Sequence, residues 1–129
     1  MTPIRTVQVT FDCAAPEQLA RFWCEVLGYR IPDGADGQET WCAAEDPTGS
    51  GPRIFFQQVP EGKVAKNRVH LDVRVGVGLV GAERESTLDV EGARLEALGA
   101  VRVRLMVADE ENESCLVMGD VEDNEFCLA

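Results

Sequence analysis

The stretch that decides the fold is Arg68-Val69-His70-Leu71-Asp72-Val73-Arg74-Val75, near the middle of the chain. Its apolar and polar residues alternate, which is the period of a strand with one buried face. The same alternation occurs earlier, in Val7-Gln8-Val9-Thr10-Phe11-Asp12. This restart predicts that the chain is built from two similar halves.

The first half continues from its strand into a helix. Pro16 suits a first helical turn, Glu17 suits the positive end of a helix, and Gly28 suits its C-terminal stop. These signals predict a helix over residues 15–28. Its apolar stripe comprises Leu19, Phe22, Trp23, Val26 and Leu27. Three strands, separated by turn-rich segments, are expected to follow at residues 29–32, 40–44 and 53–59.

The second half repeats this order of elements. A glycine-rich stretch after residues 68–75 leads to a predicted helix near residues 88–98, which Gly99 ends. Further strands are expected at residues 101–107, 114–118 and 125–128. The halves also match in sequence, with Val7-Gln8-Val9 aligned to Val69-His70-Leu71 and Phe56-Gln57 aligned to Phe126-Cys127. Such a repeat indicates duplication.

The predicted fold class is therefore α+β, with two tandem βαβββ modules. Module one covers about residues 3–60 and module two about residues 67–129 of a single domain, 1–129. In each module the apolar side of the first strand (Val7, Val9 and Phe11; Val69, Leu71 and Val73) should pack on the helix. Two curved half-sheets side by side then form a partly closed, eight-stranded, barrel-like sheet with the helices outside.

The composition limits which partners and which location are expected for the chain. The 129 residues carry a formal charge of −11, which repels phosphate backbones and anionic membranes, so neither nucleic acid nor a membrane is expected as a partner. No apolar run approaches the roughly 20 residues of a membrane span, and the N-terminus lacks a signal-peptide pattern, so the expected location is cytoplasmic. Five cysteines, without a Cys-x-x-Cys pair, do not suggest a disulfide framework.

The faces turned away from the helices would line a concave surface. A polar set on such a surface is either solvated or a ligand site, and a trough favours the ligand site. The side chains expected to bind a ligand there are Gln8, Trp41, Phe55, Gln57, His70, Asp72 and Cys127. The face of Trp41 stays open at this point, because Cys42 could take the place of Trp41 in the wall. Cys127 is either a small pocket wall or a reactive thiol.

Several stretches resemble the glyoxalase/bleomycin-resistance/dioxygenase (vicinal oxygen chelate) superfamily. They are the helix sequence of residues 15–29, residues 53–61 with 66–73, residues 94–100, and Asp123-Asn124-Glu125-Phe126-Cys127-Leu128. Together they span nearly the whole chain, and the resemblance implies the same paired βαβββ fold. Metal-using members place one ligand on each of strands one, four, five and eight. Carried over, these positions fall on Gln8, Gln57, His70 and Cys127.

That ligand set is poor for a divalent ion. His70 is the single histidine, the amides are weak ligands, and Cys127 binds only as a thiolate. Two histidines and a carboxylate, the usual oxygen-activating iron site, are excluded within one chain. No residue is therefore assigned as a metal ligand and no cofactor is expected, with a divalent metal as the disfavoured alternative. Related proteins usually carry Asp-Pro-Glu-Gly-Asn at this turn, where Val121 here replaces the proline and Asp123 the glycine. These losses should either loosen the turn or require a positive φ of Asp123.

Three functions follow as hypotheses. The first is binding of a small organic molecule in the concave pocket without a catalytic metal. The alternative is a glyoxalase-like lyase, isomerase or related enzyme, in which the catalytic residue His70 acts as general base or metal ligand and Asp72 or Gln57 orients the substrate. The third is a barrel that serves assembly only. A homodimer is expected, because members of the superfamily often pair modules across chains.

Overall fold

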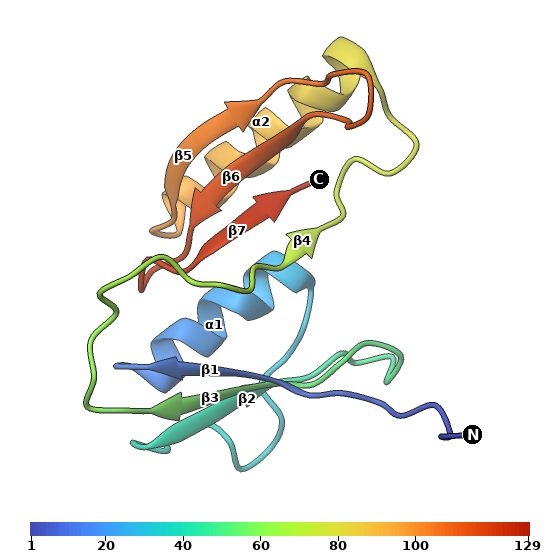
Figure 1. Cartoon of the computed structure of the whole chain (residues 1–129). Coiled ribbons are helices and arrows are strands. Elements are labelled where there is room, and N and C mark those ends of the chain that lie inside the picture. The colour runs from blue at the N-terminus through green and yellow to red at the C-terminus, as the bar shows by residue number, and fades with distance from the viewer. The chain divides into compact units, whose positions relative to one another are not determined.

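The computed structural model describes all 129 residues as an α+β chain that divides into two compact units. The first unit is Met1–Gly62 and the second is Lys63–Ala129 (Figure 1). Each unit holds one helix and one sheet. Neither helix combines the length and the apolar character that crossing a bilayer requires.

The first unit has a three-stranded sheet in the order β1-β3-β2. Its elements are β1 (Val9–Cys13), α1 (Pro16–Leu27), β2 (Trp41–Ala44) and β3 (Ile54–Gln58). β1 pairs with β3 in parallel, whereas β2 pairs with β3 antiparallel. The helix predicted over residues 15–28 is confirmed. Pro16 opens it, and Gly28, at a φ of 71°, closes it while the amide of Tyr29 donates to the carbonyl of Cys24.

One face of this sheet packs under α1. The ring centroid of Phe11 lies 5.3 Å from that of Trp23 and 5.5 Å from that of Phe56. Trp23 and Phe56 are essentially inaccessible to solvent. Burial of each such side chain stabilises the unit by about 1.5–3 kcal/mol. The alternation predicted for the first strand therefore holds, except that Val7 lies before β1 and is exposed.

The strand predicted at residues 29–32 does not form. Only one isolated bridge occurs there, in which Arg30 and Glu45 exchange both backbone hydrogen bonds at 3.0 and 2.9 Å. Pro32 has no amide proton for a further ladder bond, and the chain turns at Gly34, where φ is 86°. The prediction of eight strands was therefore wrong, and the chain contains seven.

The second unit has a four-stranded sheet in the order β4-β7-β6-β5. Its elements are β4 (Asp72–Val73), α2 (Gly81–Ala97), β5 (Val101–Met106), β6 (Cys115–Gly119) and β7 (Glu125–Leu128). β4 pairs with β7 in parallel, and the other neighbours pair antiparallel. The helix α2 covers the face that carries Leu116, because a Cβ built on Gly92 would lie 2.6 Å from Leu116 Cδ2. Leu116, Met118, Phe126 and Leu128 are buried.

Two elements of the second unit differ from the sequence prediction. The strand expected over residues 68–75 shortens to β4, and Val69 remains 79% exposed. The helix α2 begins at Gly81 instead of near Leu88. Buried Arg84 secures this added first turn, because its Nε and Nη1 donate to the carbonyls of Ser114 and Gly76 at 3.0 and 2.8 Å.

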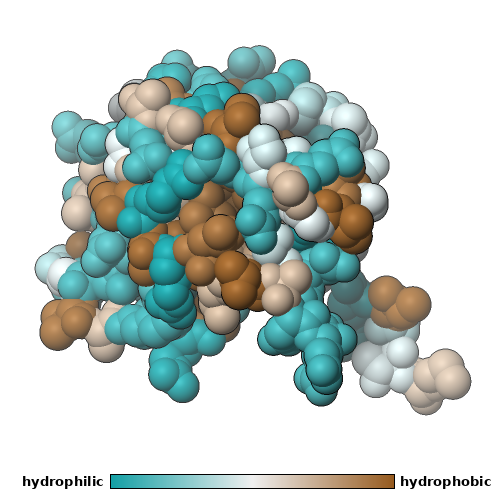
Figure 2. All heavy atoms as spheres, turned by 90° about the horizontal axis from the view of Figure 1, so that it is seen from above, coloured by the Kyte–Doolittle hydropathy of each residue, from teal (hydrophilic) through white to brown (hydrophobic).

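The strands form two separate sheets of three and four strands, and no closed eight-stranded barrel is present. Figure 2 shows hydrophilic side chains over much of the face in view, with hydrophobic side chains gathered between them. Each sheet nevertheless has one face under its own helix and one face that the helix leaves open. The candidate site lies on these open faces.

Candidate functional site

A hollow of about 200 Å³ lies on the face of the second sheet that α2 does not cover. Strand register explains why its lining side chains share that face. Asp72 pairs with Cys127, Cys127 pairs with Val117, and Val117 pairs with Arg104, so all four project to one side. Cys115 lies two residues before Val117 and projects to the same side.

Asn67 positions the segment that carries His70. Its side-chain amide donates to the carbonyls of Val69 and Glu125 at 2.8 and 3.1 Å, and its carbonyl oxygen accepts from the amide of Glu125 at 2.9 Å. The amide of Cys127 then donates to the carbonyl of Leu71. These contacts hold residues 67–71 along β7, although no continuous ladder forms there.

Three chemically active side chains converge at this hollow. His70 Nε2 lies 3.3 Å from Asp72 Oδ1. One donor atom from each of His70, Asp72 and Cys127 lies within 4.8 Å of the others. The side chains of His70 and Asp72 are 47% and 58% exposed, so both remain accessible to a ligand. The arrangement offers an imidazole, a carboxylate and a thiol to one small volume.

The thiol of Cys127 is protonated in this setting. Burial, the neighbouring thiol of Cys115 and the carboxylate of Asp72 together raise the pKa of Cys127 to about 12. Cys127 is therefore a poor nucleophile near neutral pH.

A charged rim borders the same hollow. Lys66 Nζ lies 3.0 Å from Glu125 Oε2, and the hydrogen bond from Lys66 holds the pKa of Glu125 below its usual range. Arg104 also lines the hollow and lowers the pKa of Glu125 further. The rim therefore presents two cations beside the imidazole, with Glu125 offsetting part of their charge.

The open face of the first sheet carries the other predicted residues. The rings of Trp41 and Phe55 stack at 12° with their centroids 5.7 Å apart, so Trp41 belongs to this face, whereas Cys42 is fully buried. The guanidinium carbon of Arg53 lies 5.3 Å from the centroid of Phe55, and Arg53 Nη1 donates to Gln8 Oε1 at 2.8 Å. This set is a pair of stacked rings with a cation over the ring of Phe55.

Gln57 shares the open face, because it pairs with Trp41 on one side and Asp12 on the other. This register corrects the alignment of the two halves. Asp12 pairs with Gln57 as Asp72 pairs with Cys127, so Thr10, and not Gln8, occupies the position of His70. Gln8 lies before β1, and the first unit has neither imidazole nor thiol at the positions of His70 and Cys127.

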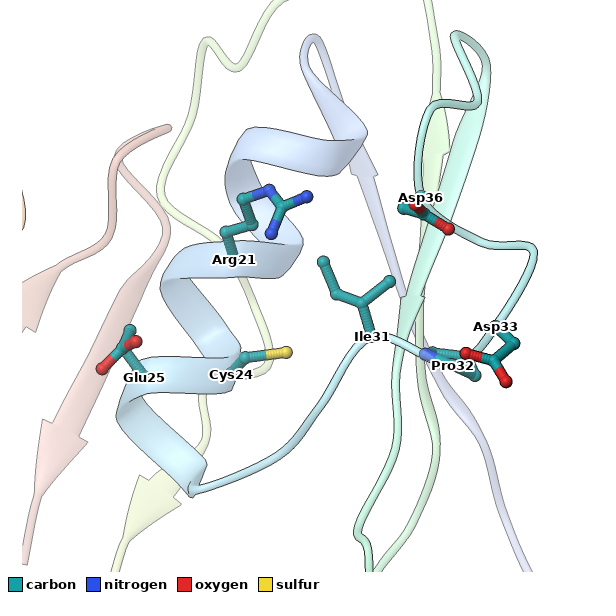
Figure 3. Close-up of a pocket in the computed structure, with 7 residues that line it drawn as sticks. All are labelled: Arg21, Cys24, Glu25, Ile31, Pro32, Asp33 and Asp36. Atoms are coloured by element: carbon teal, nitrogen blue, oxygen red, sulfur yellow. The ribbon is translucent and has the colours of Figure 1, made fainter.

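A larger hollow of about 460 Å³ occurs elsewhere in the first unit. Figure 3 shows Cys24 and Ile31 extending toward each other between α1 and the segment that follows it. None of the predicted site residues lines this hollow. Burial raises the pKa of Cys24 to about 11, and Arg21 already lies 3.7 Å from Glu17 in an ion pair. Despite its volume, the hollow presents no group poised for chemistry.

The structure thus assembles the predicted residues in two groups, one on each unit. His70, Asp72 and Cys127 are brought together at one hollow, and Trp41 and Phe55 are stacked near Gln8 and Gln57. Sequence reasoning missed several lining residues of the second unit, including Lys66, Arg104 and Cys115. Alternation places Cys115 and Val117 on one face, but only the register to β7 shows which face that is.

Comparison with known proteins agrees with this architecture. Residues 8–129 match the sequence model of the glyoxalase-like domain family. No curated protein matches the sequence significantly. Several solved structures share the fold at low sequence identity.

One is a glyoxalase/bleomycin resistance protein/dioxygenase family enzyme from Burkholderia phytofirmans, which is 13% identical. The match covers 94% of this chain and 94% of that enzyme, with a TM-score of 0.70. Another is a mutant of the fosfomycin resistance protein FosX from Listeria monocytogenes, complexed with Mn(II) and 1S,2S-dihydroxypropylphosphonic acid. It is 12% identical, and the match covers 98% of this chain and 90% of FosX, with a TM-score of 0.71. A glyoxalase-related enzyme from Fulvimarina pelagi is 15% identical. The match covers 98% of this chain and 88% of that enzyme, with a TM-score of 0.67.

The donors of this chain suit a hard ion such as Mn(II) poorly. Hard ions prefer carboxylate, carbonyl and water oxygens. The convergent group at the hollow of the second unit offers one carboxylate, that of Asp72, together with an imidazole and a protonated thiol. The carboxamide oxygen of Gln8 already accepts from Arg53. A softer metal ion, which accepts nitrogen and sulfur ligands, is compatible with the group of His70, Asp72 and Cys127.

Proposed function

The chain belongs to the glyoxalase-like domain family, and from that premise we propose that it binds a small organic molecule without needing a catalytic metal. The observation that carries this proposal is the convergence of His70, Asp72 and Cys127 at the hollow of the second unit. Ligand sites are concave, mostly apolar and furnished with a few convergent polar groups. The open face of the second sheet has these features.

The lining defines the kind of ligand that fits. Met106 and Val117 supply apolar wall, His70 and Asp72 supply hydrogen-bonding groups, and Arg104 supplies positive charge. About 200 Å³ is less than the roughly 300–1,000 Å³ of a typical ligand site. The hollow therefore accepts a compact molecule, or one polar group of a larger molecule.

We propose further that the open face of the first sheet binds the planar part of an organic ligand. The support is chemical: the stacked rings of Trp41 and Phe55 lie there, with Gln57 beside them on the same face.

The test is a screen of chemically diverse fragments by thermal denaturation of chelator-treated protein. A fragment that raises Tm is expected to bind His70→Ala about 10–100-fold more weakly, because the variant loses hydrogen bonds to the ligand. Ser86→Ala, on the exposed side of α2, is the matched control and should bind like the wild type. A screen that leaves Tm unmoved would count against ligand binding.

A second candidate function is catalysis by a glyoxalase-like lyase, isomerase or related enzyme. The contact between His70 Nε2 and Asp72 Oδ1, at 3.3 Å, favours it, because a carboxylate orients the imidazole and leaves Nδ1 for a substrate. His70 would act as general base and Asp72 as the orienting group. Once a substrate is identified, full turnover by His70→Ala would eliminate this role, whereas Asp72→Asn should retain part of the activity.

The homodimer expected from the sequence remains a proposal, and one feature supports it. β5 is an edge strand, and Val101, Val103 and Leu105 on it are 58%, 43% and 44% exposed. Exposed apolar edge strands pair readily with another chain. Sedimentation should show a dimer that Val103→Lys weakens, and a monomeric wild type would rule it out. The cytoplasmic location remains a prediction.

A further inference from the structure

Arg104 faces the hollow of the second unit because of an irregularity in β5. Arg102 pairs with Met118, which is buried on the face that α2 covers, and Arg104 pairs with the adjacent residue, Val117. A regular strand would return to the same face after two residues, so Val103 is the extra residue of a β-bulge. The bulge turns Arg104 to the open face, where it lines the hollow. Bulges often re-aim a side chain in this way next to functional sites.

The two arginines of β5 differ in what they contact. Arg102 Nη1 and Nη2 lie 2.6 and 3.1 Å from carboxylate oxygens on α2, so the helix offsets the charge of Arg102. Arg104 forms neither a hydrogen bond nor an ion pair with the chain, although it lies near enough to Glu125 to lower the pKa of that carboxyl. Glu125 is itself paired with Lys66. The guanidinium of Arg104 therefore keeps its donors free at the edge of the hollow.

A single row of paired residues crosses the open face from β4 to β5. Asp72 pairs with Cys127, Cys127 pairs with Val117, and Val117 pairs with Arg104. The row has a carboxylate at one end, a free guanidinium at the other, and a thiol and an apolar side chain between them. Its ends are three strand spacings apart, about 14 Å between the backbones. Both ends line the same hollow, which is therefore polarised along the row.

This polarity restricts the chemistry of a ligand. A guanidinium binds a planar carboxylate through two parallel N–H···O bonds. The carboxylate of Asp72 accepts hydrogen bonds but donates none, so it requires a donor group on the ligand. The formal charge of −11 repels organic acids from most of the surface. An acid therefore binds where a local cation without a counter-ion outweighs that repulsion, and Arg104 meets this condition.

We infer that the ligand of this hollow is an organic acid with a hydroxyl or amino group at the end opposite its carboxylate. Arg104 holds the carboxylate, the apolar body lies over Cys127 and Val117, and the hydroxyl or amino group donates to Asp72. The inference rests on the proposed function, because it names the class of ligand that the same hollow binds. Arg104 is then the residue that determines specificity for acids.

The probe is para-hydroxyphenylpropanoate, which carries a carboxylate and a hydroxyl at opposite ends of an apolar body. Its primary amide has nearly the same shape without the charge. Isothermal titration of chelator-treated full-length protein should show that the acid binds about 10-fold more tightly than the amide, because hydrogen bonds between charged groups are stronger than neutral ones. The difference should shrink as the salt concentration rises, since salt screens exposed charges.

Variants of Arg104 test which residue holds the carboxylate. Arg104→Met should weaken the acid about 10-fold and leave the affinity for the amide unchanged. Arg104→Lys should retain part of the preference, because it keeps the charge but loses the planar fork. Arg94→Met is the matched control, since it removes the same charge from the surface of α2, where Arg94 pairs with Glu91. It should keep the full preference. Circular dichroism shows whether the variants are folded.

The other end of the row is tested with phenylpropanoate, which lacks the hydroxyl. The wild type should bind it several-fold more weakly than the hydroxy acid, whereas Asp72→Ala should bind the two equally. Equal affinity of the wild type for acid and amide, or a preference for the acid that survives Arg104→Met, would overturn the inference. So would a failure of the probe to bind protein that binds neutral fragments, and this last result would leave the proposed function intact.

Discussion

The ring of Trp41 lies nearly parallel to the ring of Phe55, at 12° and with centroids 5.7 Å apart, on the face of the first sheet that α1 leaves open. The two residues come from antiparallel strands and are diagonal neighbours. Neither ring is fully buried. A planar ligand therefore finds an aromatic surface there, with the guanidinium of Arg53 over the ring of Phe55.

Phe55→Ala should weaken a ligand that stacks on the open face of the first sheet by about 10-fold, because stacking between rings contributes about 0.5–1.5 kcal/mol beyond area burial. Isothermal titration with a fragment identified on the wild type measures the loss. An unchanged fragment affinity would show that the ligand does not contact these rings.

The adjacent residue provides a contrast in stability. Phe56 is fully buried under α1, whereas Phe55 is partly exposed. Phe56→Ala should lower the free energy of unfolding by about 3–5 kcal/mol through the cavity that it leaves, and Phe55→Ala should cost clearly less. Urea unfolding of both variants compares them. Equal losses would mean that the assignment of faces is wrong.

Alkaline pH should destabilise the metal-free protein through its half-buried thiols. The pKa of Cys24 is raised from 9.0 to about 11 and that of Cys127 from 9.0 to about 12, so the folded state holds these protons more tightly than the unfolded state. This contribution is fully present below about pH 9 and is lost as pH rises toward pH 11 and 12. Cys127→Ser should reduce the loss of stability on titration from pH 8 to 11.

Thiol modification checks the same shift independently. At pH 8, Cys127 should react with iodoacetamide more slowly than a cysteine in an unfolded peptide, because less of it is thiolate. Mass spectrometry of the digested protein reads out each site. Modification as fast as that of a peptide would contradict the raised pKa.

Gly92→Ala should destabilise the second unit although alanine is the better helix former. A Cβ at this position would meet Leu116 Cδ2 at 2.6 Å and Arg102 Nη2 at 2.9 Å. The gain of about 1 kcal/mol in helix propensity is offset by overpacking, which typically costs about 1–3 kcal/mol. Thermal denaturation should show a lower Tm, whereas Ser86→Ala on the exposed side should not lower it.

Asp123→Gly should stabilise the turn between β6 and β7. Asp123 is the one non-glycine residue at a positive φ, 67°, so of the two outcomes expected from the loss of a glycine there, a looser turn or a positive φ, the second occurs. A left-handed conformation costs an L-residue roughly 1–2 kcal/mol, and glycine relieves this at some cost in unfolded-state entropy. The free energy of unfolding should rise by up to about 1 kcal/mol. A decrease would show that the aspartate side chain stabilises the turn by more than its backbone strains it.

Sequence reasoning reached the elements that strong local signals define. Pro16 and Gly28 bracket α1, and alternation predicts that Val9 and Phe11 face the core. It failed where contacts distant in sequence determine where an element begins or ends. The start of α2 depends on hydrogen bonds from Arg84 to carbonyls distant in sequence, and the alternation of residues 68–75 continues beyond the two residues that pair in β4.

The candidate site shows the same division. The alternation of side chains along a strand is enough to place His70 and Asp72 on the same face and Cys127 on an open face. The sequence alignment of the two halves was shifted by two residues, because local sequence does not show where the first strand begins. Gln8 was therefore assigned to the position of His70, which the register gives to Thr10. Cys115 became a site residue only through the pairing of β6 with β7.

In both units the first strand pairs in parallel with the last one. Val9 is hydrogen-bonded next to Ile54, and Asp72 next to Cys127, so each sheet joins segments that leave the ribosome far apart in time. Contacts between such distant segments slow folding. While the chain is being synthesised, β4 cannot join β6 and β5 before Glu125–Leu128 have been made, because β7 alone connects β6 to β4. A nascent chain would therefore expose its unfinished second sheet to chaperones until Glu125–Leu128 have emerged and paired.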